Sequence, residues 1–187
     1  MNKIPPQRLI DTLLEYYKAG NFNKVETLAR NLSKDFPEHP FSWKVLNIIL
    51  KNKNNISDSL IAGKKALKLD PYDPETHYNV ANTLKQLNKF DEAINYYQDA
   101  IKLNSNYIDA YNNLAITQKE KGNLEEAINI YKKLITIKPN FAEAYNNLGV
   151  ILRDSRKLKD AEKNYKKAIQ INPDYAEAYN NLGITIR

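Results

Sequence analysis

The stretch YIDAYNNLAI, residues 107–116, decides the fold because it returns twice with little change. FAEAYNNLGV begins at Phe141 and YAEAYNNLGI begins at Tyr175, so the phrase recurs every 34 residues. A fixed period of this length is typical of proteins built from stacked structural repeats. Each copy also places two adjacent asparagines inside an expected helix, where asparagine is disfavoured because its amide competes for backbone groups.

The same period extends backward through the chain without an insertion or a deletion. It predicts one array over residues 1–187, made of repeats at 6–39, 40–73, 74–107, 108–141 and 142–175 and a partial repeat at 176–187. These are numbered repeats 1 to 6 here, and positions 1 to 34 are counted from the first residue of each repeat. Position 32 is proline in four of the five full repeats, as in Pro139 and Pro173.

Each repeat is predicted to form two helices. Positions 4, 7, 8 and 11 are mostly apolar or small and fall on one face of a helix. A second helix is expected at about positions 18–31, where the proline at position 32 ends it. Position 15, between the two helices, is Gly or Asn in four repeats, which favours a left-handed residue there. Arg156 is the exception.

Small residues occupy the places where the two helices must approach closely, and large residues lie beside them. Position 8 is Ala or Gly in repeats 3 to 6, whereas position 24 is tyrosine in repeats 3 to 5. Repeat 2 departs from this pattern, with Asn47 at position 8 and Gly63 at position 24. A helix pair of this kind cannot bury its apolar face alone, so the sequence predicts an all-α fold, an α-solenoid of antiparallel helix pairs.

This pattern resembles the tetratricopeptide repeat. The residues that carry the resemblance include Tyr145, Leu148, Gly149, Ala161, Tyr165, Ala168 and Pro173. The resemblance implies a right-handed superhelix whose first helices line a groove for a partner segment. It therefore implies a protein–protein interaction scaffold that binds an extended peptide or protein segment, with no catalytic activity and no cofactor.

Composition and motifs agree with a binding protein. The chain has no cysteine, no Gly-rich phosphate loop and no nucleophile motif. His39 and His77 lack companions at metal-ligand spacing, so no metal site is predicted. The net charge of +6 is spread along the chain, which argues against nucleic acid. Pentatricopeptide RNA-binding repeats are also disfavoured, because they lack the proline and the Leu-Gly pair. We expect no leader, no membrane segment and a cytoplasmic location.

The candidate site is the face of the first helix opposite its core face. Position 6 there carries a ladder of asparagines, Asn79, Asn113, Asn147 and Asn181, and Asn82 lies at position 9 of repeat 3. Asparagine inside a helix costs about half a kcal/mol relative to alanine, so the ladder needs a reason. Two interpretations remain open. The amides bond neighbouring repeats, or they pair with the backbone of a bound peptide, since a carboxamide both donates and accepts. The first asparagine of each pair is expected at the edge of the groove.

Charged residues flank this ladder. Position 12 is basic in repeats 2 to 6, and Lys85, Lys119 and Arg153 are candidate groove residues that would favour an acidic partner. Cations near a helix C-terminus also interact well with the helix dipole, which is the alternative explanation. The carboxylates at position 2, such as Glu143 and Glu177, have the same explanation at the N-terminal end.

The asparagine ladder is similar to the repeat array of O-GlcNAc transferase and of related bacterial tetratricopeptide proteins. That resemblance implies peptide binding by Asn79, Asn113, Asn147 and Asn181. It also raises an alternative function, the substrate-recruiting N-terminal arm of a glycosyltransferase or sulfotransferase. The carboxylate clamp of chaperone-binding arrays is absent, because Lys44 is followed by Ile48 and the next repeats offer Asp109 and Asn113.

The sixth repeat stops at position 12. Its apolar residues Tyr179, Leu182 and Ile186 lack the cover that a second helix would give. Because exposed apolar ends of repeat arrays promote association, we expect either a chain that continues past Arg187 or self-association through this end.

Overall fold

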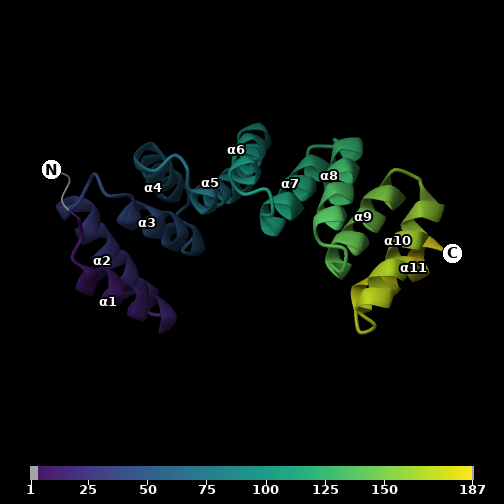
Figure 1. Ribbon diagram of the computed structural model, residues 1–187, viewed down its shortest axis with the longest axis horizontal. Coiled ribbons are helices and arrows are strands. Elements are labelled where there is room, and N and C mark those ends of the chain that lie inside the picture. The colour runs from purple at the N-terminus through teal and green to yellow at the C-terminus, as the bar shows by residue number, and fades with distance from the viewer. Residues whose placement is uncertain (1–3, 187) are drawn as a thin grey trace. The chain divides into compact units, whose positions relative to one another are not determined.

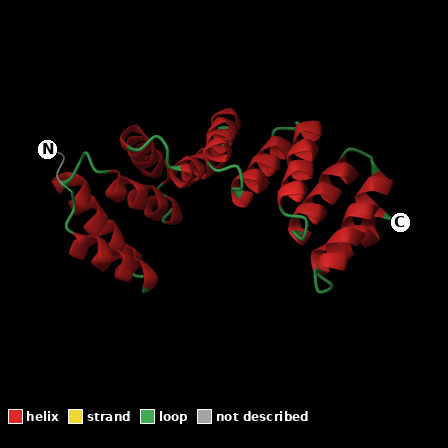
Figure 2. Ribbon diagram, in the orientation of Figure 1, coloured by secondary structure: helices red, strands yellow, loops and turns green. Residues whose placement is uncertain are grey.

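A computed structural model describes residues 4–186 of the chain, and in these residues it contains helices and no strand (Figures 1 and 2). The first helices of the repeats are α1 (Gln7–Lys18), α3 (Pro40–Asn52), α5 (Pro74–Gln86), α7 (Ile108–Glu120), α9 (Ala142–Asp154) and α11 (Ala176–Thr185). The second helices are α2 (Phe22–Asp35), α4 (Ile56–Leu69), α6 (Phe90–Leu103), α8 (Leu124–Ile137) and α10 (Leu158–Ile171). The predicted all-α solenoid of helix pairs is confirmed.

The helices keep the 34-residue register. Every second helix covers positions 17–30, one residue earlier than the sequence suggested, as α8 shows by ending at Ile137 before Pro139. In repeats 2 and 3 a proline opens the first helix at Pro40 and Pro74, where its missing N–H costs no hydrogen bond.

The chain divides into two compact units, Met1–Leu103 with α1 to α6 and Asn104–Arg187 with α7 to α11. Within each unit, consecutive helices pack against each other, and first helices of neighbouring repeats also touch, as α3 does α5 and α9 does α11. A single array of all six repeats stays a prediction.

The turn inside each full repeat contains one residue with a left-handed backbone. Gly20, Asn54, Asn88 and Gly122 have positive φ, as the sequence indicates. Arg156 also has φ 59°, although its residue type disfavours this conformation. A residue with a Cβ in this region costs about 1 kcal/mol more than glycine, so the packing of α9 against α10 imposes the conformation on Arg156.

The interior follows the predicted alternation of small and large residues. Tyr97, Tyr131 and Tyr165 are fully buried at position 24. A Cβ added at Gly149 would lie 2.6 Å from the Tyr165 ring, so the tyrosine occupies the space that the small residue leaves.

Repeat 2 reverses this arrangement. Asn47 is buried at position 8, and its Nδ2 donates to the Ser59 carbonyl oxygen at 2.9 Å and to the Ser59 Oγ at 3.0 Å. A Cβ added at Gly63 would lie 2.5 Å from Val80 Cγ2 and 2.8 Å from Asn47 Nδ2. The larger side chain therefore comes from the first helix in repeat 2 and from the second helix in repeats 3 to 5.

Candidate functional site

The asparagines of the C-terminal unit lie on α7, α9 and α11. Asn113 and Asn147 are half-buried, and Asn181 is 9% exposed. The position-5 asparagines differ from the expected edge placement, because Asn146 is completely buried and only Asn180 is exposed. The first helix of the following repeat covers α9, which one repeat considered alone does not reveal.

A chain of amide hydrogen bonds joins successive repeats. Asn181 Nδ2 donates to Asn146 Oδ1 at 3.0 Å. One repeat earlier, Asn147 Nδ2 donates to Asn112 Oδ1 at a longer 3.4 Å. The position-6 amide therefore reaches back to position 5 of the preceding repeat, and this contact supplies a structural reason for two adjacent asparagines.

The position-2 carboxylates take part in the same interfaces. Asn112 Nδ2 donates to Glu143 Oε1, and Asn146 Nδ2 donates to Glu177 Oε1, both at 3.1 Å. Each position-5 amide thus donates to the next repeat through its nitrogen and accepts from it through its oxygen. These two glutamates therefore do more than complement the helix dipole.

A buried tyrosine supports the first of these interfaces. The Tyr131 hydroxyl donates to Asn112 Oδ1 at 2.8 Å. Burial raises the pKa of the Tyr131 hydroxyl well above its ordinary value of 10, so it remains a neutral donor at physiological pH.

A small cavity opens beside these amides, between α7 and α9. It has a volume of about 230 Å³ and is lined by Ile116 and Lys119 of α7 and by Asn147 and Val150 of α9, among others. Two of the predicted groove residues, Lys119 and Asn147, therefore meet at one cavity. Its apolar walls and polar neighbours are the usual composition of a small binding site.

The predicted basic residues of this unit have acidic neighbours. Lys119 Nζ lies 3.1 Å from Asp154 Oδ2, and Arg153 Nη2 lies 3.7 Å from Asp154 Oδ1. Asp154 therefore offsets part of their positive charge. Arg153 Nη1 also donates to Asn181 Oδ1 at 3.5 Å.

The remaining predicted residues lie on α5 in the N-terminal unit. Asn79, Asn82 and Lys85 are all half-buried. The Asn82 Oδ1 accepts from the buried Tyr97 hydroxyl at 2.6 Å, and the Asn79 carbonyl oxygen accepts from Thr83 Oγ1 at 2.9 Å. Asn82 thus holds a core tyrosine of its own repeat, much as Asn112 holds Tyr131.

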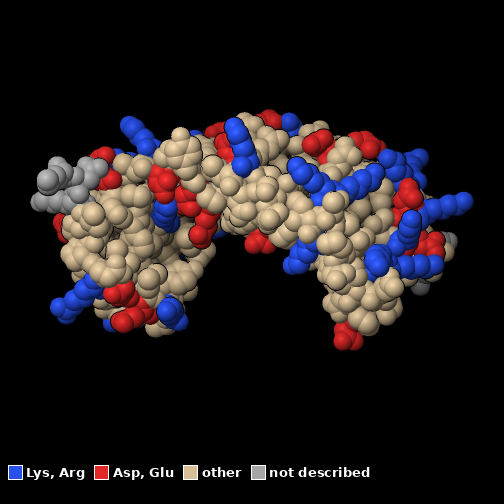
Figure 3. Space-filling view, in the orientation of Figure 1, with Lys and Arg blue, Asp and Glu red and all other residues tan. Residues whose placement is uncertain are grey.

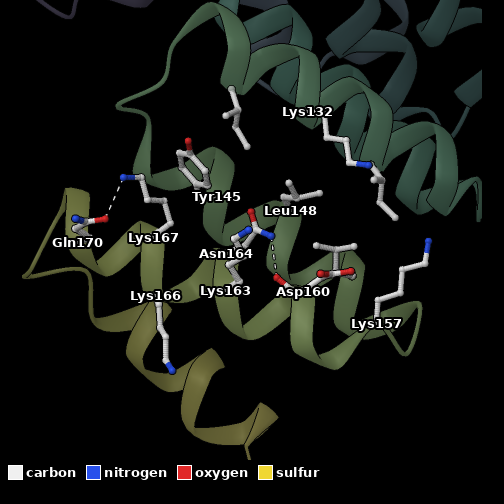
Figure 4. A pocket seen from close by; sticks show the side chains of 13 residues that line it. Lys132, Tyr145, Leu148, Lys157, Asp160, Lys163, Asn164, Lys166, Lys167 and Gln170 are labelled. Carbon is white, nitrogen blue, oxygen red and sulfur yellow. Dashed lines mark hydrogen bonds between the residues drawn. The ribbon is translucent and has the colours of Figure 1, made fainter.

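A larger groove in the C-terminal unit was not predicted from the sequence. It lies between α8 and α10 with α9 beneath it and has a volume of about 960 Å³ (Figure 4). It uses positions 4, 7 and 11 of α9, which the periodicity assigns to the core. The available signal was Asn164, a polar residue at position 23, where α6 has Tyr96 and α8 has Ile130.

The residues that the structure describes provide neither a metal site nor a membrane-spanning helix. Among residues 4–186, no cluster of three or more His, Asp or Glu side chains could hold a metal ion. His77 Nε2 lies 2.9 Å from the Pro71 carbonyl oxygen and its ring contacts Tyr96, which agrees with its structural interpretation. None of the described helices is long and apolar enough to cross a bilayer.

Three known sequence families match the chain, and all three describe the same kind of repeat. A family described as "TPR repeat" matches residues 81–122 and 117–155, and two described as "Tetratricopeptide repeat" match residues 142–175 and residues 62–95 and 164–187. Together these matches run without a gap from residue 62 to residue 187. The chain belongs to the tetratricopeptide-repeat family. No curated protein sequence matches this tetratricopeptide-repeat chain.

Solved structures of similar tetratricopeptide-repeat proteins cover nearly the whole chain. A crystal structure of MamA is 26% identical with a TM-score of 0.82, and the match covers 91% of this chain and 93% of that one. YrrB, described as "a TPR protein with an unusual peptide-binding site", is 20% identical with a TM-score of 0.80 and coverages of 92% and 89%. MamA from Desulfovibrio magneticus RS-1 is 15% identical with a TM-score of 0.83 and coverages of 91% and 96%. The latter two similarities show the fold alone.

Proposed function

We propose that this tetratricopeptide-repeat chain is a scaffold that binds an extended peptide segment along the first helices of its repeats. The cavity of about 230 Å³ between α7 and α9 carries the proposal, because it brings Lys119, Asn147 and apolar side chains together. An apolar side chain of the peptide would enter the cavity, and the Asn147 carboxamide would pair with the peptide backbone. The peptide-binding site named in the description of YrrB supports the same class of function.

We expect the preferred peptide to carry carboxylates next to the apolar residue that enters the cavity. Lys119 and Arg153 would attract these carboxylates, although Asp154 lies beside both cations and Glu120 also lines the cavity. Exposed charges are screened over about 8–10 Å at physiological ionic strength, so binding of acidic peptides should weaken as salt is added.

Selection of random dodecapeptides displayed on phage, with the intact chain as bait, provides the probes for the first prediction. Peptides bound at the proposed site should lose about tenfold in affinity when Asn113 and Asn147 are both replaced by alanine, because one or two backbone hydrogen bonds are removed. Fluorescence polarisation measures the change. Asn129→Ala, on the exposed side of α8, is the matched control and should bind like the parent.

Two outcomes would count against this site. If peptides bind the double variant as tightly as the parent, the two asparagines do not take part in peptide recognition. A double variant that loses its helical circular dichroism would show that the amides serve the fold instead.

We further propose that a second copy of the chain covers the apolar face of α11. Tyr179 and Ile186, at positions 4 and 11, are 51% and 62% exposed. Light scattering should show a mass that rises with concentration, and Ile186→Lys should abolish the rise by placing a charge in the contact. A constant monomer mass over the same range would contradict this association.

A further inference from the structure

The large groove of the C-terminal unit has an apolar base between two second helices. Its base includes Ile128 and Ile135 of α8 and Tyr145, Leu148 and Leu152 of α9. Tyr145 and Ile135 are half-buried, whereas Leu148 is 4% exposed. Figure 4 shows the Tyr145 ring and Leu148 between the helices that carry the surrounding lysines. An incoming apolar side chain would therefore contact mainly Tyr145 and Ile135.

The rim of the groove is basic. Its lining contains the lysines Lys132, Lys157, Lys163, Lys166 and Lys167 and a single carboxylate, Asp160. Lys and Arg side chains are also prominent over this part of the C-terminal unit in Figure 3. The groove therefore presents positive charge around an apolar base.

Only some of these lysines are neutralised. Lys157 Nζ lies 2.6 Å from Glu125 Oε1, and Lys166 Nζ lies 2.6 Å from Glu162 Oε1. Neither Lys132 nor Lys163 forms a salt bridge among residues 4–186, although the charge of Lys132 contributes to lowering the pKa of Glu125. The Asn164 Nδ2 donates to the Asp160 carbonyl oxygen within α10 at 2.8 Å, so its short side chain is held along its own helix.

The equivalent positions of the N-terminal unit explain why this groove is open. There position 23 is Tyr96, whose ring centroid lies 5.8 Å from that of His77 at position 4. Lys64, at the position of Lys132, pairs with Glu92 at 3.3 Å, and Glu92 holds the position of Asp160. In the N-terminal unit, an aromatic contact and an ion pair therefore fill the position of the groove. In the C-terminal unit, Asn164 leaves Tyr145 partly uncovered.

The chemistry of the groove fits a protein segment better than other anionic partners. Its volume of about 960 Å³ is at the upper end of the roughly 300–1,000 Å³ range of ligand pockets, so it accommodates several side chains. Single-stranded nucleic acids need aromatic side chains on which bases stack, and Tyr145 is the only aromatic residue in this lining. Apolar side chains flanked by carboxylates match both the base and the rim.

We propose that the groove between α8 and α10 is a second docking surface of this chain, for an acidic protein segment that inserts apolar side chains against Tyr145 and Ile135. Lys132 and Lys163 provide the attraction, and Asn164 provides the space. The surface shares no residue with the cavity between α7 and α9, so it does not depend on the function proposed above.

Dodecapeptides selected on phage against the intact chain, with subtraction against Asn164→Tyr, are the probes for this surface. Tyrosine at position 164 reproduces the arrangement of Tyr96 and fills the groove without changing the net charge. The enriched peptides should combine Asp or Glu with apolar residues and lose at least about tenfold in affinity toward Asn164→Tyr. They should bind the Asn113/Asn147 double alanine variant as tightly as the parent.

A charge reversal inside and outside the groove separates specific docking from general attraction. Lys163→Glu should weaken binding at least about fivefold, whereas Lys159→Glu, an exposed position of the same helix outside the lining, should have a much smaller effect. Equal losses for the two variants would overturn the proposal, as would a selection that enriches no acidic, apolar peptide. Tighter binding of an RNA oligonucleotide or of anionic lipid vesicles that also depends on Lys163 and Asn164 would overturn the assignment to a protein segment.

Discussion

Replacing Gly63 with tyrosine is expected to unfold the N-terminal unit or to destabilise it by more than about 3 kcal/mol. The backbone of α4 at Gly63 leaves no room even for a Cβ, which would lie 2.5 Å from Val80 Cγ2. Overpacking of this size cannot be relieved by a rotamer change, because the conflict begins at the first side-chain atom. Urea denaturation followed by circular dichroism measures the loss.

The second substitution Asn47→Ala should recover part of this loss. Together the two changes recreate the residue pair of repeat 4, which has Ala115 at position 8 and Tyr131 at position 24. Asn47→Ala alone should cost about 1–3 kcal/mol, because it removes the bonds that the Asn47 Nδ2 donates to the carbonyl oxygen and the hydroxyl of the buried Ser59. The double variant should therefore be more stable than the sum of the two single losses predicts.

A pair of alanine substitutions provides the control. Gly63→Ala should destabilise, whereas Gly183→Ala, where an added Cβ meets nothing within 4 Å, should stabilise by up to about 1 kcal/mol through helix propensity. Additive losses in the double variant, or equal effects of the two glycine-to-alanine changes, would contradict the packing argument.

Asn146→Ala is expected to destabilise the C-terminal unit by about 1–3 kcal/mol despite the better helix propensity of alanine. The Asn146 side chain is completely buried and bonds both Asn181 and Glu177 of the next repeat. Its removal leaves the nearly buried Asn181 amide without this acceptor. The free energy of unfolding, obtained from urea titration, is the measurement.

Asn180→Ala tests the same motif position where it is exposed. That substitution should be neutral or slightly stabilising, because an exposed helical asparagine loses nothing and alanine favours the helix. Equal unfolding free energies for Asn146→Ala and Asn180→Ala would show that the amide contacts between repeats contribute nothing to stability.

The helices could be predicted closely because their causes are local. A 3.6-residue apolar pattern and a proline at position 32 place each helix within about one residue. In the sequence, Asn47 and Gly63 only depart from the pattern of the other repeats. That the large residue lies on the first helix and the small one on the second becomes clear only when the two helices are packed together. Arg156 likewise follows the geometry of its repeat rather than its own preference.

The candidate site was less predictable. The burial of Asn146 and its bonds to α11 depend on the neighbouring repeat, so a single helix viewed in isolation places that residue at an edge. The groove at Tyr145 was missed because its α9 residues occupy core positions. Of these residues Tyr145 is left partly uncovered, because Asn164 lacks the ring that Tyr96 places over the equivalent position.

The amide contacts between repeats have a consequence for how such a chain can change in length. Each interface of the C-terminal unit is closed by the same set of three residues, with one asparagine contributed by the earlier repeat and an asparagine and a glutamate by the later one. A duplicated or deleted 34-residue segment therefore meets a complementary partner at both of its ends. A shift of any other length would separate these groups and leave buried amides unpaired, so duplication within this unit preserves the contacts only in whole 34-residue steps.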